Sequence, residues 1–254
     1  IKYAFYYRNT LFKNSRENDV TVLNLRFRNV TSGYYDHNIF VSHDEIVLLA
    51  TELDATENPI NSTGHLIIYN LISSEHRIIQ KINGWSWQQA NLFQVKGNMI
   101  FFNNNNSMGY KGFITNSSGE LIKELEHPIV SIHDNKSLYA SIDLVRLIKH
   151  NKDYGIDVDK STFESDVILH ICDYKLNKTM YSLKKDRLKK VLSWRDELWI
   201  NHPKFLGDSV VFIARYWLKE KRVSRTVIWE YDRDELSLMD FEYMSHYCVS
   251  VDKT

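Results

Sequence analysis

The stretch Gly84-Trp85-Ser86-Trp87-Gln88-Gln89 decides how the rest of the chain is interpreted. It places tryptophans and glutamines at the entrance of a predicted strand, residues 90–95, which ends in a turn at residues 96–98. The next predicted strand, residues 99–102, is wholly apolar and is therefore expected to be buried. A cycle of polar or aromatic entrance, strand, tight turn and apolar strand is typical of the inner half of a β-propeller blade.

The same order of segments recurs along the chain and predicts four blades of four strands each. The predicted strands are 39–42, 46–51, 65–70 and 76–82; 90–95, 99–102, 112–116 and 121–125; 128–131, 137–144, 167–174 and 179–183; and 201–205, 210–215, 226–231 and 236–241. A fragment of a blade is expected at each end, with strands at 2–7 and 20–27 and the opening of a further blade at 245–252. We therefore predict an all-β fold: a single β-propeller domain spanning residues 1–254, built of four-stranded antiparallel blades. The chain either forms a ring of about five blades or is a fragment of a larger, seven-bladed propeller.

Three segments interrupt this regular pattern. A long insertion, residues 145–166, separates the second and third strands of the third blade, and insertions of this kind often carry function. Short helical potential is confined to residues 144–149 and 193–199. The basic run at residues 184–190 is interpreted as a solvated strand edge or loop in preference to a nucleic-acid patch.

Composition excludes several classes of protein. Lys and Arg together number 32, as do Asp and Glu, so the chain lacks the net basic field of non-specific nucleic-acid binding, and no nucleic-acid partner is expected. No apolar run approaches the length of a transmembrane helix, so no membrane span is expected. The two cysteines form no C-x-x-C pair and no signal peptide is visible, which favours the cytoplasm. Because the chain begins at Ile1 and not at Met, the sequence leaves open whether an upstream segment has been removed by processing. The cellular location of the protein is therefore left open as well.

The hairpin turns at residues 42–45 and 132–136 resemble a degraded form of the Ser-Pro-Asp-Gly-Lys turn of TolB-type and WD40-like propellers. Other segments, as a set in this order, resemble bacterial propeller proteins related to oligogalacturonate lyase: 33–37, 87–89, 128–131, 141–147, 153–155, 201–205 and 245–247. Members of that group often lie among polysaccharide-related genes and mostly lack an assigned activity. In the lyases a divalent metal, held by histidines and a glutamine, acidifies the proton next to a uronate carboxylate. The resemblance implies His202 and His246 as metal ligands here, although the rest of such a cluster is not identifiable in this chain.

Residues that open the innermost strands of a propeller line its central channel, where ligands usually bind. Polar groups from separate blades converge there, as a ligand site requires. The predicted substrate-binding residues are Tyr35, Asp36, His37, Trp87, Gln88 and Lys204, with Tyr154 at the rim. The alternative is structural: these side chains satisfy loop backbone groups and tie neighbouring blades together. Trp85 and Trp87 suit stacking on sugar rings, whereas packing between blades is the expected role of at least one of them.

Asp143, Arg146 and His202 are the catalytic candidates. Arg146 could hold a carboxylate or phosphate in a bidentate way, and the alternative is an Asp143–Arg146 ion pair that fixes the insertion. For His202 and His246 the alternative to metal binding is an ordinary hydrogen-bonded histidine. The sequence has no G-x-S-x-G, H-E-x-x-H or glycine-rich phosphate loop, which disfavours serine hydrolases, zincins and P-loop enzymes.

These observations favour a carbohydrate-binding or scaffolding propeller linked to bacterial polysaccharide metabolism, with the ligand at the mouth of the central channel. The abundance of aromatic residues, 15 Tyr, 12 Phe and 6 Trp, suits a carbohydrate-facing cleft. The alternative is a lyase-like or hydrolase-like enzyme that uses the histidine, arginine and aspartate residues at the channel mouth, with or without a divalent metal. Whether the chain is an enzyme and needs a cofactor is left open, and a partner protein is the second candidate ligand.

Overall fold

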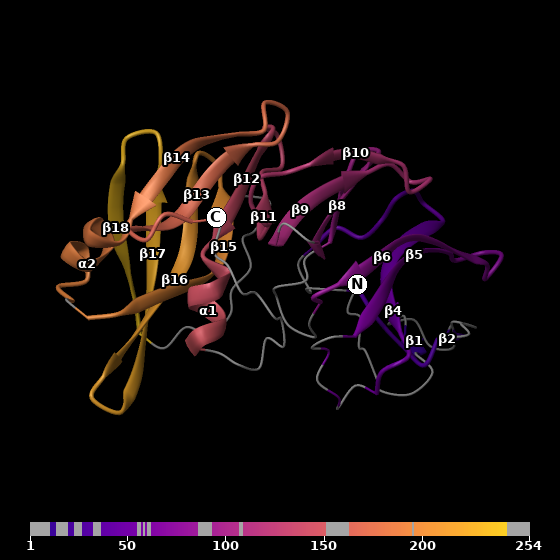
Figure 1. Cartoon of the computed structure of the whole chain (residues 1–254), viewed down its shortest axis with the longest axis horizontal. Helices are drawn as coiled ribbons and strands as arrows, with labels where there is room; N and C mark the ends of the chain where they lie inside the picture. Colours follow the sequence, from indigo (N-terminus) through magenta and orange to yellow (C-terminus); the bar gives the residue numbers. More distant parts are fainter. Residues whose placement is uncertain are drawn as a thin grey trace. The chain divides into compact units, whose positions relative to one another are not determined.

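The computed structural model describes most of the chain (Figure 1). The described residues are 11–13, 20–22, 27–32, 37–54, 57, 59, 62–85, 93–106, 109–150, 163–194 and 196–242, with only the backbone given for 11–13, 20–22 and 240–242. The chain divides into two compact units, one built around the first two four-stranded sheets and the other around the last two. Each unit is described by itself.

Most of the described strands lie in four sheets of four antiparallel strands, and in each of these sheets neighbours in sequence are neighbours in the sheet (Figure 1). The first contains β3 (Asn29–Thr31), β4 (Glu45–Thr51), β5 (Thr63–Asn70) and β6 (His76–Asn83). The second contains β7 (Gln94–Lys96), β8 (Met99–Asn106), β9 (Gly109–Thr115) and β10 (Leu121–Glu124). The third contains β11 (Ser131–Ile132), β12 (Leu138–Ile142), β13 (Val167–Asp173) and β14 (Lys178–Lys184). The fourth contains β15 (Leu198–Leu206), β16 (Ser209–Leu218), β17 (Lys221–Glu230) and β18 (Glu235–Glu242).

This meander order is that of a propeller blade, so the predicted all-β fold with four-stranded antiparallel blades is confirmed. We call the sheets blades 1 to 4. A separate two-stranded sheet pairs β1 (Leu11–Lys13) with β2 (Val20–Val22), which is the start of the strand predicted at residues 20–27; residues 23–26 lie outside the described residues. The predicted end strands at 2–7 and 245–252 lie outside the described residues. The number of blades, the closure of the ring and the single domain stay predictions.

Blade 1 differs from its prediction in the first strand. The predicted segment, residues 39–42, contributes only an isolated bridge between Phe40 and Ile46, and the first strand of the sheet is β3, paired with the far end of β4. β3 and the segment at residues 39–42 both lie along β4. The second contact is shown by the amide of Val47, which donates to the carbonyl of Ile39 over 2.8 Å. The inner edge of this blade is therefore made of two pieces where the sequence pattern indicates one.

Blade 2 differs in the asparagine run at residues 103–106, which was expected to be a loop and is the end of β8. Asn104 shows why the strand continues. Its side-chain oxygen accepts from the amide of Asn83 over 2.8 Å, and its amide nitrogen donates to the carbonyl of Lys81 over 3.1 Å. Hydrogen bonds to β6 of blade 1 thus overcome the low strand propensity of asparagine.

Apolar side chains of blades 1 and 2 form a shared core. Trp85 is fully buried within it and contacts the region of Gly64, where a Cβ atom would lie 3.3 Å from the indole ring. The predicted packing role of at least one tryptophan of the opening stretch is therefore confirmed for Trp85.

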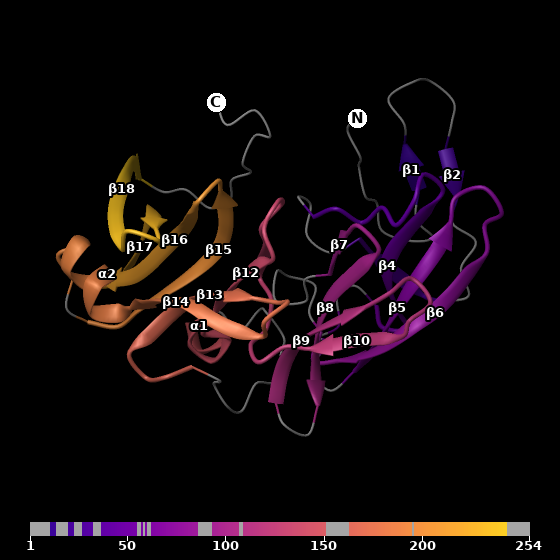
Figure 2. The same cartoon turned by 90° about the horizontal axis from the view of Figure 1, so that it is seen from above.

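Blades 3 and 4 follow their predicted strands, except that the first strand of blade 3, predicted at 128–131, is the two-residue β11 (Ser131–Ile132). Two short helices accompany these blades. Helix α1 (Leu144–His150) begins the predicted insertion and confirms the helical potential at 144–149; it packs on β15, as do β11 and β12. Helix α2 (Lys185–Val191) replaces the strand edge or loop expected at residues 184–190, so that prediction was wrong. Figure 2 shows α2 beside β18, with which it is in contact. Each helix has 7 residues, and in the described part of the chain no helix could cross a membrane.

The helix predicted at residues 193–199 is also wrong, because α2 ends there. Ser193 has a left-handed backbone, with φ of 52°, and its amide donates to Lys190 while that of Trp194 donates to Lys189. These two bonds are those of a Schellman motif, which terminates a helix. β15 then starts at Leu198, three residues before the predicted strand.

Candidate functional site

The residues predicted at the blade entrances fall into two groups. Tyr35, Asp36, Trp87, Gln88, Tyr154 and His246 lie outside the described residues, so their roles stay predictions. His37, Asp143, Arg146, His202 and Lys204 are described, and all but Arg146 are less than one-tenth exposed. In the described residues no group of three or more His, Cys, Asp and Glu side chains could hold a metal ion.

The entrance of blade 1 joins two blades. His37 is buried, and the next residue, Asn38, accepts from the amide of Val95 over 2.8 Å and donates to the carbonyl of Val95 over 3.0 Å. Val95 belongs to β7 of blade 2. These contacts tie blades 1 and 2 together next to the entrance, and the role of His37 itself stays a prediction.

Asp143 and Arg146 are brought together at the start of α1. The Asp143 carboxylate accepts from the amide of Arg146 over 3.2 Å, and the amide of Leu147 donates to the Asp143 carbonyl, as expected of a helix N-cap. The same carboxylate lies 3.4 Å from the Arg146 guanidinium, with side-chain exposures of only 8% and 11%. The ion pair of the alternative interpretation is therefore present, and the catalytic roles of Asp143 and Arg146 stay predictions.

The Arg146 guanidinium has further neighbours. It donates to the carbonyl of Ser165, near the end of the insertion, over 3.3 Å and lies 3.8 Å from the carboxylate of Glu197. Glu197 also pairs with Lys149 over 3.2 Å and lies 3.8 Å from His150, whose ring stacks on Trp199 with centroids 4.2 Å apart. Burial lowers the pKa of His150 despite the opposing charge of Glu197. This network holds both ends of the insertion.

His202 and Lys204 lie within β15 and not at its start. The pairing of β15 with β16 joins Asn201 to Ile213 and Lys204 to Val211, so His202 and Pro203 together face one residue of β16. This is a β-bulge, and proline, which cannot donate to the ladder, is tolerated at such a site. His202 is left-handed, with φ of 53°, and 5% exposed. A strained residue of this kind often marks a functional position. Its predicted catalytic and metal-binding roles stay predictions, as does the role of Lys204 in substrate binding.

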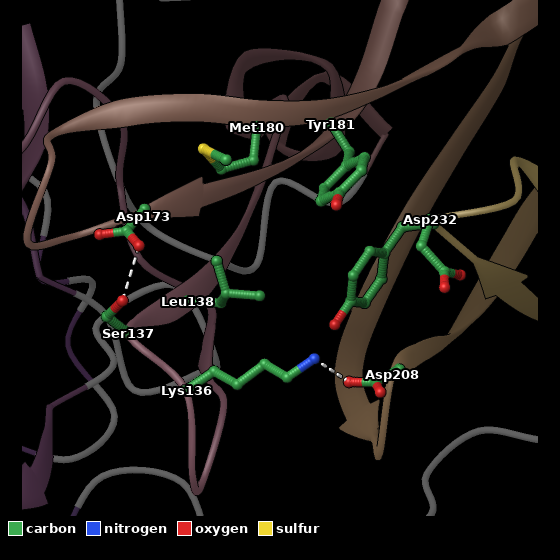
Figure 3. A pocket seen from close by; sticks show the side chains of 9 residues that line it. Lys136, Ser137, Leu138, Asp173, Met180, Tyr181, Asp208 and Asp232 are labelled. Atoms are coloured by element: carbon green, nitrogen blue, oxygen red, sulfur yellow. Dashed lines mark hydrogen bonds and ion pairs between the residues drawn. The ribbon is translucent and has the colours of Figure 1, made fainter.

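A cavity of about 510 Å³, which sequence reasoning missed, lies between blades 3 and 4 (Figure 3). Its lining residues come mostly from hairpin turns and the adjoining strand ends: Lys136, Ser137, Leu138, Asp173, Met180, Tyr181, Asp208, Tyr231 and Asp232. The turns lie at the opposite end of the strands from the entrances, where the ligand was expected. Asp173 and Tyr231 fall in the strands predicted at 167–174 and 226–231, and Asp232 directly follows the second of these, so the sequence pattern predicted none of them as a site residue.

One wall of the cavity is aromatic. The rings of Tyr181 and Tyr231 have centroids 5.0 Å apart and are inclined by 46°. Tyr231 is 3% exposed and packs edge-on against Phe205 and Trp229. Its hydroxyl makes no hydrogen bond of normal geometry with the described residues. Burial, followed by the nearby charge of Asp208, raises the pKa of Tyr231.

The other wall is charged. Lys136, in the first turn of blade 3, reaches across to Asp208, in the first turn of blade 4, and forms an ion pair (Figure 3). The Asp208 carboxylate also lies 3.9 Å from the Nε2 atom of His133. Asp173 accepts from the Ser137 hydroxyl over 2.6 Å and caps its own turn. The cavity thus combines an aromatic face with several hydrogen-bonding groups.

A third feature is a buried histidine pair. The rings of His127 and His170 stack with centroids 4.6 Å apart, and Phe163 contacts both rings. His170 also shares a hydrogen bond of 2.8 Å with Ser182. Burial lowers the pKa of both histidines to about 4, and Lys111 adds to the effect on His127.

No protein-family model matches the chain, and no curated protein matches it. Among solved structures, TolB from Acinetobacter baumannii shares 8% identity at a TM-score of 0.47, over 90% of this chain and 48% of that one. The β-propeller domain of the Trilobed protease from Pyrococcus furiosus shares 13% identity at a TM-score of 0.43, over 79% of this chain and 55% of the other. The dihydro-heme d1 dehydrogenase NirN in complex with DHE shares 10% identity at a TM-score of 0.49, over 94% of this chain and 44% of that one. The chain spans about half the length of these structures.

Proposed function

We propose that this chain is a non-catalytic carbohydrate-binding propeller and that the cavity between blades 3 and 4 holds a sugar residue. The observation that carries the proposal is the buried Tyr231 of the cavity lining, whose hydroxyl makes no hydrogen bond of normal geometry with the described residues. A buried hydroxyl without a partner is costly, and a ligand that supplies the partner recovers that cost. The cavity volume of about 510 Å³ lies within the usual range for small-ligand sites.

The aromatic wall suits the apolar face of a sugar ring. Tyr181 and Tyr231 offer a rigid surface, and Met180, 43% exposed, extends it with a side chain that adapts to irregular shapes. The same lining contains Asp208, Asp232 and Lys136, which supply acceptors and a donor for sugar hydroxyl groups. This lining therefore complements a sugar, whose ring has an apolar face and carries polar hydroxyl groups at its edge.

The structural role of the Asp143–Arg146 pair weighs against the enzyme alternative. A lyase-like reaction would require Arg146 to hold a substrate carboxylate, and this guanidinium already lies against Asp143 and Glu197. The scaffolding role and the link to bacterial polysaccharide metabolism stay predictions. So does a second ligand at the mouth of the central channel.

Two variants test the cavity as a sugar site. Tyr231→Phe removes only the hydroxyl, so the free energy of unfolding is expected to change by no more than about 0.5 kcal/mol. Affinity for a bound oligosaccharide, measured by isothermal titration calorimetry, is expected to fall about fivefold to tenfold, since one hydrogen bond contributes about 1 kcal/mol. Tyr181→Ala is expected to weaken binding more strongly, because it removes half of the aromatic wall.

The matched control is Tyr174→Phe, a buried tyrosine that does not line the cavity. It is expected to leave the affinity unchanged. Equal affinities for the parent protein, Tyr231→Phe and Tyr181→Ala would contradict the proposed site. Mass spectrometry of the recovered ligand separates the two functions: an intact oligosaccharide agrees with a binding module, and a cleaved one would show an enzyme.

A further inference from the structure

The charged residues of the cavity indicate which class of sugar it would bind. This inference rests on the proposed function. Three aspartates line it, Asp173, Asp208 and Asp232, against a single lysine, Lys136. A site of this balance repels uronate and other acidic sugars and attracts positive charge.

The three carboxylates are not equivalent. Asp173 is held by the Ser137 hydroxyl at 2.6 Å and by the backbone amides of Lys175 and Leu176. Burial alone would raise the pKa of Asp173, but these hydrogen bonds keep it below its usual value, so the group stays ionised. It therefore contributes negative charge while its oxygens are already occupied. Asp232 is exposed and makes no hydrogen bond or ion pair to the described residues.

Asp208 is the carboxylate of the cavity that pairs with a cation, the ammonium group of Lys136. The Lys136 ammonium reaches it from the neighbouring blade, and both side chains are about half exposed, at 48% and 62%. An exposed ion pair of this type contributes little to stability. A ligand ammonium can therefore replace the Lys136 ammonium at Asp208 without a large cost.

Tyr231 supplies the second recognition element. Its hydroxyl lies close enough to Asp208 for that carboxylate to affect its ionisation, but it makes no hydrogen bond of normal geometry with the described residues. The ring of Tyr231, with that of Tyr181 at 5.0 Å, also presents a π-face, which attracts an ammonium group.

We propose that the cavity selects a sugar with a free amino group, whose ammonium binds Asp208 in place of Lys136 while its ring packs on Tyr181 and Tyr231. In the absence of ligand, Lys136 stands in for the ammonium and acts as a built-in competitor. The selectivity is therefore set by one carboxylate and opposed by one lysine.

The experiment compares two probes of equal length, a β-1,4-linked glucosamine tetramer and its fully N-acetylated counterpart, by calorimetry on the full chain. At low ionic strength the amine form is expected to bind at least tenfold more tightly. The difference is expected to shrink in 0.5 M sodium chloride, because exposed charge pairs are screened. Trilysine is the third probe and is expected to bind more weakly than the glucosamine tetramer, since it lacks a ring for the tyrosine wall.

Three variants assign the effect to Asp208 and Lys136. Asp208→Asn is expected to abolish the preference for the amine, and Lys136→Met, which keeps the aliphatic stem, to raise affinity for the amine severalfold. Asp186→Asn, an exposed aspartate on α2 outside the cavity, is the control of equal charge change and is expected to leave the preference intact.

The outcomes separate this inference from the proposed function. Equal or tighter binding of the acetylated tetramer, still weakened by Tyr231→Phe, would overturn the amine preference and leave the sugar site standing. Failure of every sugar probe to bind would overturn both. Amine binding that Asp208→Asn and Tyr231→Phe leave unchanged would place the interaction elsewhere and overturn the inference. Trilysine binding as tightly as the tetramer would overturn the assignment to a sugar.

Discussion

Asp143 shows how one side chain can suit both a catalytic and a structural role in a sequence, while the fold gives it structural contacts. The acid and the arginine three residues later are the types of residue that a carbohydrate-active site uses, and their spacing is equally that of an N-cap and the third residue of a helix. The sequence supports both interpretations because it does not show how deeply the pair is buried. Burial of the two side chains to 8% and 11% exposure supports the ion pair, and the catalytic roles of Asp143 and Arg146 stay predictions.

Removing the Asp143 carboxylate is expected to be costly. Asp143→Ala leaves Arg146 buried without its main partner and removes the helix cap, so the free energy of unfolding should fall by about 3–5 kcal/mol. Asp143→Asn keeps a capping oxygen and should recover about 1 kcal/mol of this loss. Urea denaturation followed by circular dichroism measures both values.

The matched control is Lys149→Ala on the same helix. Lys149 is 64% exposed and pairs with the half-exposed Glu197, so the loss is expected to stay below about 1 kcal/mol. A loss for Asp143→Ala no larger than that of Lys149→Ala would contradict the structural role assigned to the buried pair.

At the scale of elements, the sequence pattern predicted the strands and turns that local residue types determine. It missed the elements that are held by contacts with distant parts of the chain. Hairpin turns and apolar middle strands were predicted correctly for blades 3 and 4, because turn residues and burial are visible in sequence. The strand through residues 103–106 was missed, since its asparagines are held by hydrogen bonds to another blade. Helix α2 was missed because a run of charges hides the single buried residue, Leu188, that anchors it.

A glycine in the outer turn of blade 2 tests how closely that blade approaches blade 1. Gly119 has φ of +86°, and a Cβ atom there would lie 2.6 Å from the carbonyl oxygen of Ile79. Gln80 donates to the Gly119 carbonyl over 2.8 Å, which fixes the approach. Gly119→Ala is therefore expected to cost more than the backbone strain of about 1–2 kcal/mol alone.

Gly97 offers the control for this substitution. It also has a positive φ, +58°, but a Cβ atom there would meet nothing within 4 Å. Gly97→Ala should therefore show the backbone cost alone, about 1 kcal/mol in thermal denaturation. Equal losses at the two positions would mean that the close approach at Ile79 is absent in solution.

At the scale of the whole molecule, the fold class was predictable and the candidate site was not. A repeated order of strands and turns is a property of the sequence, so the four-stranded blades could be inferred without coordinates. The cavity combines residues from separate blades, such as Lys136 and Asp208, which are 72 positions apart. The sequence alone does not show which turns of separate repeats meet.

The buried histidine pair is expected to make stability depend on pH. Both histidines have folded pKa values of about 4, against about 6.5 in an unfolded chain, so the unfolded state takes up protons first as the pH falls. Their contribution is present in full above pH 6.5, is lost progressively between pH 6.5 and 4, and changes little below that. Each pKa unit corresponds to about 1.4 kcal/mol. Melting temperatures across this range measure the effect.

Replacing His127 and His170 together by leucine removes the two groups that titrate here. The melting temperature of the double variant should vary less between pH 6.5 and 4 than that of the parent chain. Replacing His43, whose side chain is 98% exposed, should leave the slope unchanged. An unchanged slope in the double variant would show that other groups control acid unfolding.

The bulge in β15 has a consequence for how this chain tolerates insertion and deletion. Asn201 and Lys204 pair with residues two apart on β16, so the strand carries one residue more than its partner. A chain that lacks His202 alone would close the ladder and keep the side chains before and after the gap on their present faces. Such a shortened chain is expected to fold, and any property that disappears with the deleted residue would belong to the imidazole and not to the architecture.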